Sequence, residues 1–476
     1  MTDSRNDTQG DDQKGKPQRS AESQSQRHSA RSLWLHTDYR WWWGADTSFA
    51  LSGSLLGFVL PLLVLAATGT TVAATGVNAV TMAVAGALML VGGMLQDTFD
   101  RRRLLMIQGL MGFVIYGAIA GLYQANMLGL PVLMVIAVLL GVRSGLFGGT
   151  TNSMLRGVVP DEDLPVAISL NNGRDAAIQV AGGPLGGLLM GISKALPVWA
   201  CMVLNGIATL CSFGIHNYWK KSDGGKSGDS EPSNNEPGDQ ATHAYAAKAP
   251  KASHPVRQHV TDALAGLRWL LTTRFNRHTL VPSAVGFGCF NALITLSILD
   301  IVQQGKGTLS AGFIYSSIGI GMLFGSLVSA KIVSHVPTGV IAMIAFVVMT
   351  VTAVGITLAP NAWLRFLFLL VCMALLPAGN ASMGGFQAIL VSKSAQGRVN
   401  AGLGTIEMIV SPVIVALSGV FMQWFGYRTA GVILSIVTLL SVLYGFSMKA
   451  MRAIPTPDGW HAFVEEYRIP TLGQER

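Results

Sequence analysis

The sequence predicts an all-α membrane protein with twelve transmembrane helices in two pseudo-symmetric six-helix bundles. Of the 476 residues, 50% are apolar and only 12% are Asp, Glu, Lys or Arg, about half the charged share of soluble domains. Apolar runs near the roughly 20 residues that cross a bilayer recur along the chain. The second half of the chain also repeats positions of the first half at a fixed offset.

The apolar runs are separated by short clusters of charge, and only 14 charged residues lie between Trp41 and Tyr218. The runs are too long and continuous for barrel strands, which alternate over about ten residues. In the first half we expect spanning helices at 42–66, 76–96, 104–123, 130–150, 165–190 and 197–218. In the second half we expect them at 280–302, 310–333, 339–358, 363–390, 401–425 and 430–450.

Polar stretches separate these parts of the chain. Residues 1–40 form a mostly disordered N-terminal tail and 219–258 a disordered linker, because both contain few large apolar residues. Residues 259–276 have apolar side chains at helical spacing, which suits a helix lying in the membrane interface. An early extension of the seventh span is the alternative. The bundles then occupy 41–218 and 277–450, and 451–476 is a C-terminal tail.

Most of the 33 Lys and Arg lie in the two tails and the even-numbered connections. By the positive-inside rule both termini are cytoplasmic, in a multi-pass protein of the cell membrane. The net charge of +8 therefore indicates topology rather than a nucleic-acid partner. The first 40 residues have no apolar core, so they are not a cleavable signal peptide. All four cysteines lie in spans without metal-ligand spacing, and we expect no metal and no cofactor: Cys201, Cys211, Cys289 and Cys372.

The repeat has an offset of 233 residues. It aligns Thr75, Gly86, Met89, Leu90 and Gly92 of the second span with Thr308, Gly319, Met322, Leu323 and Gly325 of the eighth, and Val166, Leu170 and Gly186 of the fifth with Val399, Leu403 and Gly419 of the eleventh. Each half holds an even number of spans, so both copies insert the same way up. Two such bundles can rock about a site at the membrane midplane, which is the basis of alternating access.

The connection after the second span carries the most distinctive motif, Gly93-Met-Leu-Gln-Asp97-Thr-Phe-Asp100-Arg101-Arg102-Arg103-Leu-Leu. It resembles the cytoplasmic-loop signature of the major facilitator superfamily, in the form found in its macrolide-efflux and enterobactin-exporter branch. The resemblance implies a conformational gate in which Asp97 docks on the start of the eleventh span, near residues 400–402. Ordinary solvated loop charge is the alternative.

A second motif, Gly183-Pro184-Leu-Gly186-Gly187, resembles a fifth-helix signature that the superfamily carries mainly in exporters that exchange substrate for protons. The resemblance implies a helix hinge that seals against the eighth span. Small residues let helices approach closely, and proline bends a helix. Gln179 and Leu188 stand where the signature has glycines, and a plain packing motif is the alternative.

Charged residues inside spans are expensive and persist where they are paired, hydrated or used. Here they include Asp46, Arg143, Arg174 and Glu407. Arg143 matches the arginine of the superfamily's fourth-helix signature, and we expect it to pair with Asp46. Arg174 and Glu407 are equivalent in the repeat but opposite in charge. Glu407 is the first candidate for a proton-coupling group and Asp46 the second; a structural buried pair and a carboxylate hydrated from the cytoplasm are the alternatives.

The candidate residues for a substrate cavity combine polar and aromatic groups without a cluster of charge: Asn78, Phe113, Tyr116, Asn291, Tyr315, Asn380 and Gln387. Such a lining suits small amphipathic molecules, and the chain has no phosphate-binding loop for ATP. We expect a monomeric, proton-coupled secondary exporter of drug-like or siderophore-like compounds, embedded in membrane lipid, and not an enzyme. The alternatives are a lipid or lysolipid translocator, a nutrient-uptake symporter and a membrane-embedded sensor.

Overall fold

The computed structural model describes residues 33–160, 162–216, 268–392 and 395–470. The predicted linker at 219–258, nearly all of the N-terminal tail at 1–40 and half of the interfacial helix at 259–276 lie outside these residues.

The first half of the chain forms seven helices: α2 (Thr37–Thr68), α3 (Thr71–Thr98), α4 (Arg101–Gln124), α5 (Leu130–Phe147), α6 (Thr150–Val158), α7 (Leu164–Ile192) and α8 (Leu196–Phe213). Local sequence sets their ends. Gly69 ends α2 in the left-handed conformation with φ 70°, which glycine adopts without strain. The Asp100 side chain caps α4 by accepting from the backbone N–H of Arg102, and α5, α7 and α8 each carry proline in the first turn, where its missing N–H costs nothing.

The second half forms α10 (Arg274–Gln303), α11 (Thr308–His335), α12 (Thr338–Leu358), α13 (Ala362–Leu390) and α14 (Gln396–Phe446), then α15 (Lys449–Arg452), the short 3₁₀ helix η1 (Pro457–Gly459) and α16 (Trp460–Glu466). Within α14, Gly426 has φ 79° and ψ 167°, which are not helical angles. The chain therefore turns at Gly426, and α14 contains two successive spans.

The described residues confirm the predicted fold class. Ten stretches are long and apolar enough to cross a membrane. One of them, Gly402–Phe446, is divided at Gly426 and supplies two spans. The twelfth span is α7, which is 29 residues long but carries Arg174 and Asp175 among its apolar residues. The 233-residue offset moves each helix of the first half onto a helix or half-helix of the second, so the repeat extends over all six pairs of spans.

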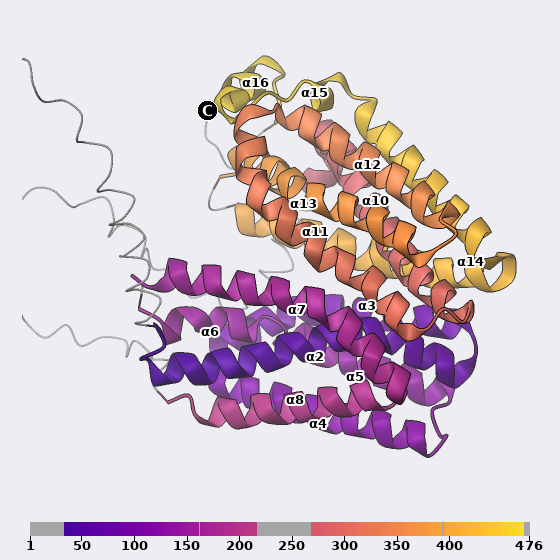
Figure 1. The fold of residues 1–476 in the computed structure, drawn as a ribbon. Coiled ribbons are helices and arrows are strands. Elements are labelled where there is room, and N and C mark those ends of the chain that lie inside the picture. Colours follow the sequence, from indigo (N-terminus) through magenta and orange to yellow (C-terminus); the bar gives the residue numbers. More distant parts are fainter. Residues whose placement is uncertain (1–32, 161, 217–267, 393–394, 471–476) are drawn as a thin grey trace, which may run out of the picture.

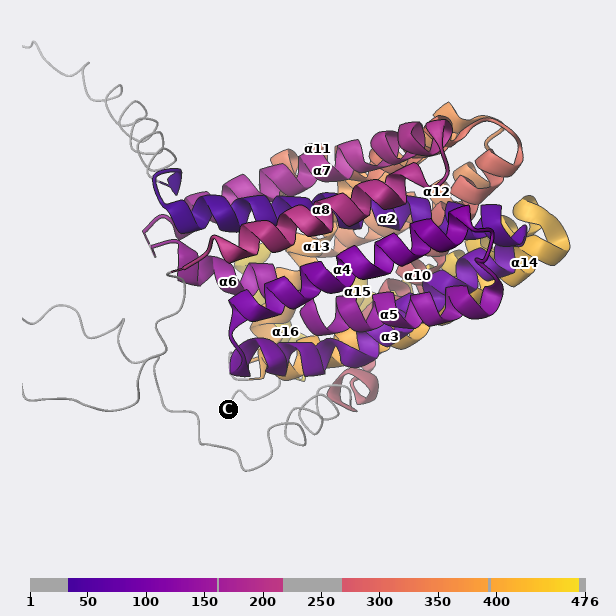
Figure 2. The same ribbon diagram turned by 90° about the horizontal axis from the view of Figure 1, so that it is seen from below.

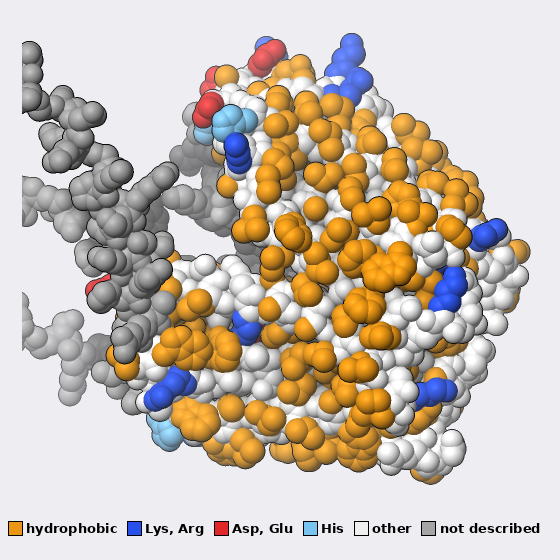
Figure 3. All heavy atoms as spheres, viewed as in Figure 1, with side chains coloured by type: hydrophobic (Ala, Val, Ile, Leu, Met, Phe, Trp, Pro, Cys, Tyr) orange, Lys and Arg blue, Asp and Glu red, His pale blue; other side chains and the backbone are white. Residues whose placement is uncertain are grey.

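The two halves lie against each other as separate bundles (Figure 1). We call the end where α2 begins and α16 lies the near end, and the opposite end the far end. Within the first half, α2 packs between α7 and α8, and α4 packs on α8, as the view from below also shows (Figure 2). Hydrophobic side chains cover most of the middle of the visible face, and many of the charged ones lie towards its two ends (Figure 3). This distribution suits a bundle whose flank is surrounded by lipid.

The halves touch most closely towards the far end, through α7 against α11 and α3 against α14. A side chain on Gly183 would collide with the carbonyl oxygen of Gly312, and the Thr308 hydroxyl donates to the Gly187 carbonyl oxygen at 2.7 Å. On the other flank, the Thr71 backbone N–H donates to the Gln423 side-chain oxygen at 2.9 Å. The contact depends on small residues because only they allow two backbones to come this close.

The C-terminal segment folds onto the near end of the second half, an arrangement that a tail at 451–476 did not lead us to expect. Ile454 and Phe463 are buried there with Phe386 of α13. The Trp460 ring lies 5.8 Å from that of Phe386, and its indole N–H donates to the Thr338 hydroxyl at 3.1 Å. The segment therefore packs against the start of α12 and the end of α13.

Candidate functional site

A cavity of about 710 Å³ lies between the two halves. It is lined from α3 and α5 on one side and from α10 and α14 on the other, and most of the lining residues sit in the near-end parts of these helices: Met82, Ala85, Gly86, Met89, Gly93, Gln96, Ser144, Gly145, Gly148, Gly149, Asn291, Gly404, Glu407, Met408, Ser411 and Pro412. The halves therefore meet at the far end and enclose a hollow towards the near end. Thioethers and glycines dominate its wall, with a few polar groups.

Among the described residues that line this cavity, Glu407 is the one charged side chain. It is exposed, and no hydrogen bond or ion pair is recorded for it among the described residues. A carboxylate in a mostly apolar wall is costly to keep charged without a partner. Glu407 is thus placed to take up a proton or a cationic group from the cavity.

The repeat counterpart of Glu407 is Arg174, and its surroundings differ. The Arg174 guanidinium donates to the Asp46 carboxylate, and it donates to Asp175 at 2.7 Å. The side chains of Arg174 and Asp46 are only 8% and 10% exposed, whereas that of Asp175 is 50% exposed. The buried arginine is therefore fully compensated, and the three residues together carry one net negative charge.

The prediction that Asp46 pairs with Arg143 is wrong. Arg143 instead donates to three neutral acceptors: the Gln108 carbonyl oxygen at 3.0 Å, the Tyr116 hydroxyl at 3.3 Å and the Asn205 side-chain oxygen at 2.6 Å. These partners lie on α4 and α8, so the guanidinium points into the first half. Asp46 pairs with Arg174 of α7 instead, and sequence spacing does not reveal which neighbouring helix each buried charge meets.

The loop between α3 and α4 binds to its own half. Arg102 donates to the carbonyl oxygens of Ser212 at 3.3 Å and Phe213 at 2.7 Å, the last residues of α8, where the helix dipole favours a cation. Arg101 donates to the Ser153 carbonyl oxygen of α6. The positive residues of the loop thereby tie α4 to α6 and α8.

The side chain of Asp97, the residue expected to dock in the conformational gate, is 78% exposed and lies 4.0 Å from Arg101. Gly93 lines the cavity, whereas Asp100 caps α4 and lies 3.8 Å from Arg103. The side chains of residues 400 and 401, where Asp97 is expected to dock, lie outside the description. The docking of Asp97 in a conformational gate therefore stays a prediction.

The glycines of the second motif lie at the far-end contact. Gly183 and Gly187 face Gly312 and Thr308 of α11, while Gly186 faces Phe58 of α2. Pro184 lies within the continuous helix α7. The motif thus takes part in the contact that separates the cavity from the far end; its role as a hinge stays a prediction.

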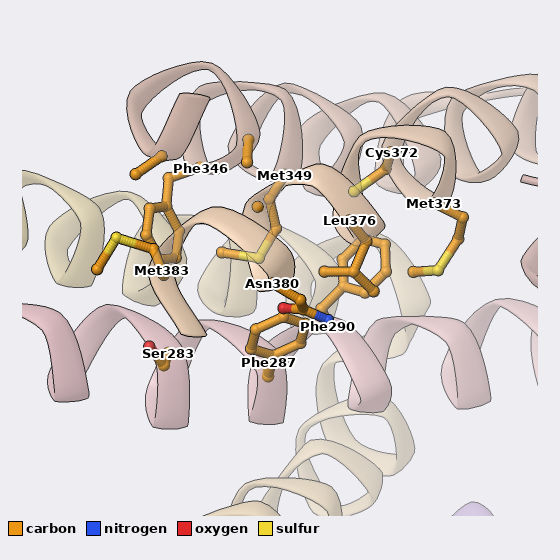
Figure 4. Close-up of a pocket in the computed structure, with 13 residues that line it drawn as sticks. Ser283, Phe287, Phe290, Phe346, Met349, Cys372, Met373, Leu376, Asn380 and Met383 are labelled. Carbon is orange, nitrogen blue, oxygen red and sulfur yellow. The ribbon is translucent and has the colours of Figure 1, made fainter. Parts of the chain in front are cut away.

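A smaller apolar recess of about 90 Å³ lies inside the second half, between α10, α12 and α13 (Figure 4). Its wall contains three phenylalanines and three methionines, namely Phe287, Phe290, Phe346, Met349, Met373 and Met383, with Cys372 beside them. Asn380 and Ser283 are its polar groups. Phe287 of the recess and Asn291 of the large cavity lie one helical turn apart on α10, so the two spaces are neighbours.

The predicted cavity residues divide accordingly. Asn291 lines the large cavity and Asn380 the recess. Tyr116 is buried in the Arg143 network, Tyr315 lies 5.7 Å from Phe58 near the far-end contact, and Phe113 faces Gly206 on the side of α8. Asn78 and Gln387 line neither the large cavity nor the recess.

Sequence reasoning missed a second buried ion pair. Arg365, only 3% exposed, lies 2.7 Å from Asp300 and 4.4 Å from the centre of the Tyr427 ring. It joins α10, α13 and the turn after Gly426 at the far end. Arg365 lies at the edge of a predicted span, where a charge is ordinary, and for that reason the pair was missed. A signal was present in the repeat, because the offset aligns Asp300 with the uncharged Ala67 of the first half.

The family model of the Major Facilitator Superfamily matches residues 43–395, which is more than half of the chain. The protein belongs to the Major Facilitator Superfamily. Its membership and its fold indicate a multi-pass membrane transporter rather than an enzyme. No curated protein matches the sequence. Within the described residues, no three His, Cys, Asp or Glu side chains lie together in a way that would hold a metal ion.

Solved structures of transporters share the fold at low sequence identity. The nucleoside transporter NupG matches with a TM-score of 0.62 and 13% identity over 88% of this chain and 99% of its own. An inward-facing bacterial homologue of the iron transporter ferroportin matches with a TM-score of 0.60 and 14% identity over 87% and 98%. A D-xylose–proton symporter matches with a TM-score of 0.58 and 12% identity over 85% and 96%. At these identities the likeness concerns the fold alone.

Proposed function

We propose that this transporter exports small amphipathic molecules by alternating access, in exchange for protons that bind at Glu407. The observation that carries the proposal is the cavity of about 710 Å³, with a single carboxylate in an apolar wall, between two halves that are in contact at the far end. A wall of methionines and glycines with a few polar groups suits amphipathic ligands better than sugars, which need many hydrogen bonds.

The direction of transport follows from the topology that we propose. With both termini cytoplasmic in the cell membrane, the near end faces the cytoplasm, and the basic loop with Arg101, Arg102 and Arg103 meets anionic headgroups there. The cavity then opens towards the compartment from which an exported molecule is loaded. The resemblance to the macrolide-efflux and enterobactin-exporter branch supports the same direction.

Glu407 supplies the coupling because its carboxyl group cannot hold a proton and carry the negative charge that binds a substrate at the same time. When the cavity faces the acidic outside, the carboxylate takes up a proton; when it faces the cytoplasm, the proton leaves and the charge becomes available to a substrate. Asp46 is the second candidate, but its bond to Arg174 already compensates its charge. We therefore assign coupling to Glu407 and a structural role to Asp46.

The test is export into vesicles that carry an imposed pH gradient, screened over amphipathic drugs, siderophores and lysolipids. We expect that collapsing the gradient abolishes export and that Glu407→Gln does the same while the protein stays folded. Glu465→Gln, which changes an exposed carboxylate of α16, is the matched control and should export normally. Export that persists both without the gradient and in Glu407→Gln rejects the coupling, and lysolipid as the sole substrate would favour the translocator.

A further inference from the structure

The two halves of the protein carry different side chains at two positions that the repeat makes equivalent. In the first half, Arg143 of α5 and Tyr116 of α4 belong to a hydrogen-bonded network that also includes Asn205 of α8. The 233-residue offset places Leu376 and Met349 at the same two positions in the second half. Both line the apolar recess. The recess therefore exists because shorter, apolar side chains replace a charged network.

A corresponding change removes the partner of the cavity carboxylate. Arg174 of the first half is compensated by Asp46, and the offset turns this pair into Glu407 and Thr279. The Thr279 hydroxyl donates to the carbonyl oxygen of Asn276 in its own helix and has no charge to offer. As far as the described residues go, the second half thus presents a carboxylate without a compensating charge to the cavity, and an apolar recess lies next to that cavity along α10.

The recess is suited to a compact apolar group. Its volume of about 90 Å³ is smaller than the roughly 150 Å³ of an engineered apolar cavity that binds benzene. Methionine side chains are unbranched and adapt their shape readily, and their sulfur atoms make favourable contacts with aromatic rings. Met349, Met373 and Met383 line the same recess as Phe287 and Phe346 (Figure 4). Small movements of these side chains admit one aromatic ring or a branched alkyl group.

The charges around the large cavity select the other part of the ligand. Glu407 is the one charged side chain among the described residues that line the cavity. The buried group of Asp46, Arg174 and Asp175, which is not part of this lining, carries one net negative charge. The positive charge of Arg143 is bonded to acceptors inside the first half. An organic cation therefore gains an ion pair with Glu407, whereas an organic anion is repelled by that carboxylate.

We propose that the substrate is an organic cation that carries an aromatic or branched apolar group, with its charge against Glu407 and its apolar group in the recess between α10, α12 and α13. The inference rests on the proposed transport function and specifies its substrate class. One helical turn of α10, from Phe287 to Asn291, separates the recess from the large cavity that Glu407 lines, so one molecule can extend from one space into the other.

Three ions of similar size separate the two requirements. Tetraphenylphosphonium has rings and a positive charge, tetrabutylammonium has the charge without rings, and tetraphenylborate has the rings with a negative charge. We expect the purified protein in lipid nanodiscs to bind tetraphenylphosphonium at least tenfold more tightly than either of the others, measured by titration calorimetry against empty nanodiscs. Equal affinity for the phosphonium and the borate, or binding of none of the three, overturns the proposal.

Two variants assign the preferences to the two subsites. Glu407→Gln should abolish the preference for the phosphonium over the borate. Gly379→Leu should abolish the preference for rings, because its first side-chain atom lies in ordinary contact with Ala345 and the rest fills the recess. Gly384→Leu is the control on the same helix, since a side chain there meets open space. If Gly379→Leu does not fold, Ala345→Leu fills the recess from α12.

These outcomes are distinct from a failure of the proposed function. If Gly379→Leu or Ala345→Leu binds all three ions like the unchanged protein, the recess is not the apolar subsite. If proton-driven export of neutral or anionic compounds is found while the cation preference is absent, the substrate class is wrong and the transport mechanism stands. If cations bind as expected but no transport depends on the pH gradient, the coupling is wrong and the binding site stands.

Discussion

Arg174 and Glu407 show how one position in a duplicated fold can serve two purposes. Arg174 is held by Asp46 and Asp175 in the first half, where the three side chains join α2 to α7. Glu407 faces the cavity, and within the described part of the chain it has no such partner. Three replacements make the difference, since the repeat places Glu407, Met408 and Thr279 where the first half has Arg174, Asp175 and Asp46.

Asp46→Asn should therefore destabilise the protein strongly. Removing the buried partner of an ion pair costs about 3–5 kcal/mol, and the partner that Arg174 keeps, Asp175, is half exposed and compensates the buried charge only weakly. Asp175→Asn makes the same chemical change at a half-exposed carboxylate, where about 1 kcal/mol or less is expected. Unfolding in mild detergent, followed by the loss of helical circular dichroism, compares the two. Equal losses of stability in the two variants would show that the ion pair between Asp46 and Arg174 does not stabilise the protein more than the one with Asp175.

At the scale of the helices, the far-end contact between α7 and α11 depends on glycine. A side chain on Gly183 would collide with the backbone of Gly312, whereas one on Gly191, farther along α7, would lie 3.7 Å from the nearest atom, the Thr308 hydroxyl oxygen. Overpacking of this kind costs about 1–3 kcal/mol, and it acts on the conformation that is in contact at the far end. A substitution at Gly183 therefore favours the opposite conformation.

We expect Gly183→Ala to raise the exposure of the far-end contact by about tenfold, since 1.4 kcal/mol corresponds to a factor of ten. The reporter is a cysteine introduced by Ala311→Cys, a fully buried position of α11, labelled with a membrane-impermeant thiol reagent. Gly191→Ala should leave the labelling rate unchanged. Similar rates for Gly183→Ala and Gly191→Ala would show that the contact does not control opening.

The helices themselves were predictable because lipid requires every spanning segment to be continuous and apolar. The predicted and observed bounds of α3 and α12 differ by only a few residues. The rotation of each helix about its axis was not predictable from spacing, and for that reason Arg143 was assigned to Asp46 rather than to Gln108 and Asn205. The recess was also missed, because a cavity reflects side chains that are too small for their surroundings rather than a motif.

At the scale of the whole molecule, the repeat explains both the contact and the cavity. Thr71 and Gly419 on one flank and Thr308 and Gly187 on the other form similar threonine-to-carbonyl bonds. When these two far-end contacts separate, the halves can rock about the cavity between them, which opens the far end while the near end closes. The C-terminal segment around Trp460 belongs to the second half alone and moves with it.

The central claim is that the two halves move as units about the cavity, and distances between spin labels test it most directly. One pair, Arg156→Cys with Lys331→Cys, reports on the near end, and a second pair, Ser193→Cys with Pro360→Cys, reports on the far end; all four positions are exposed. Across a pH titration in nanodiscs, we predict that the near-end distance shortens as the far-end distance lengthens. Distances that stay single-valued throughout, or that change in the same direction at both ends, would contradict the account.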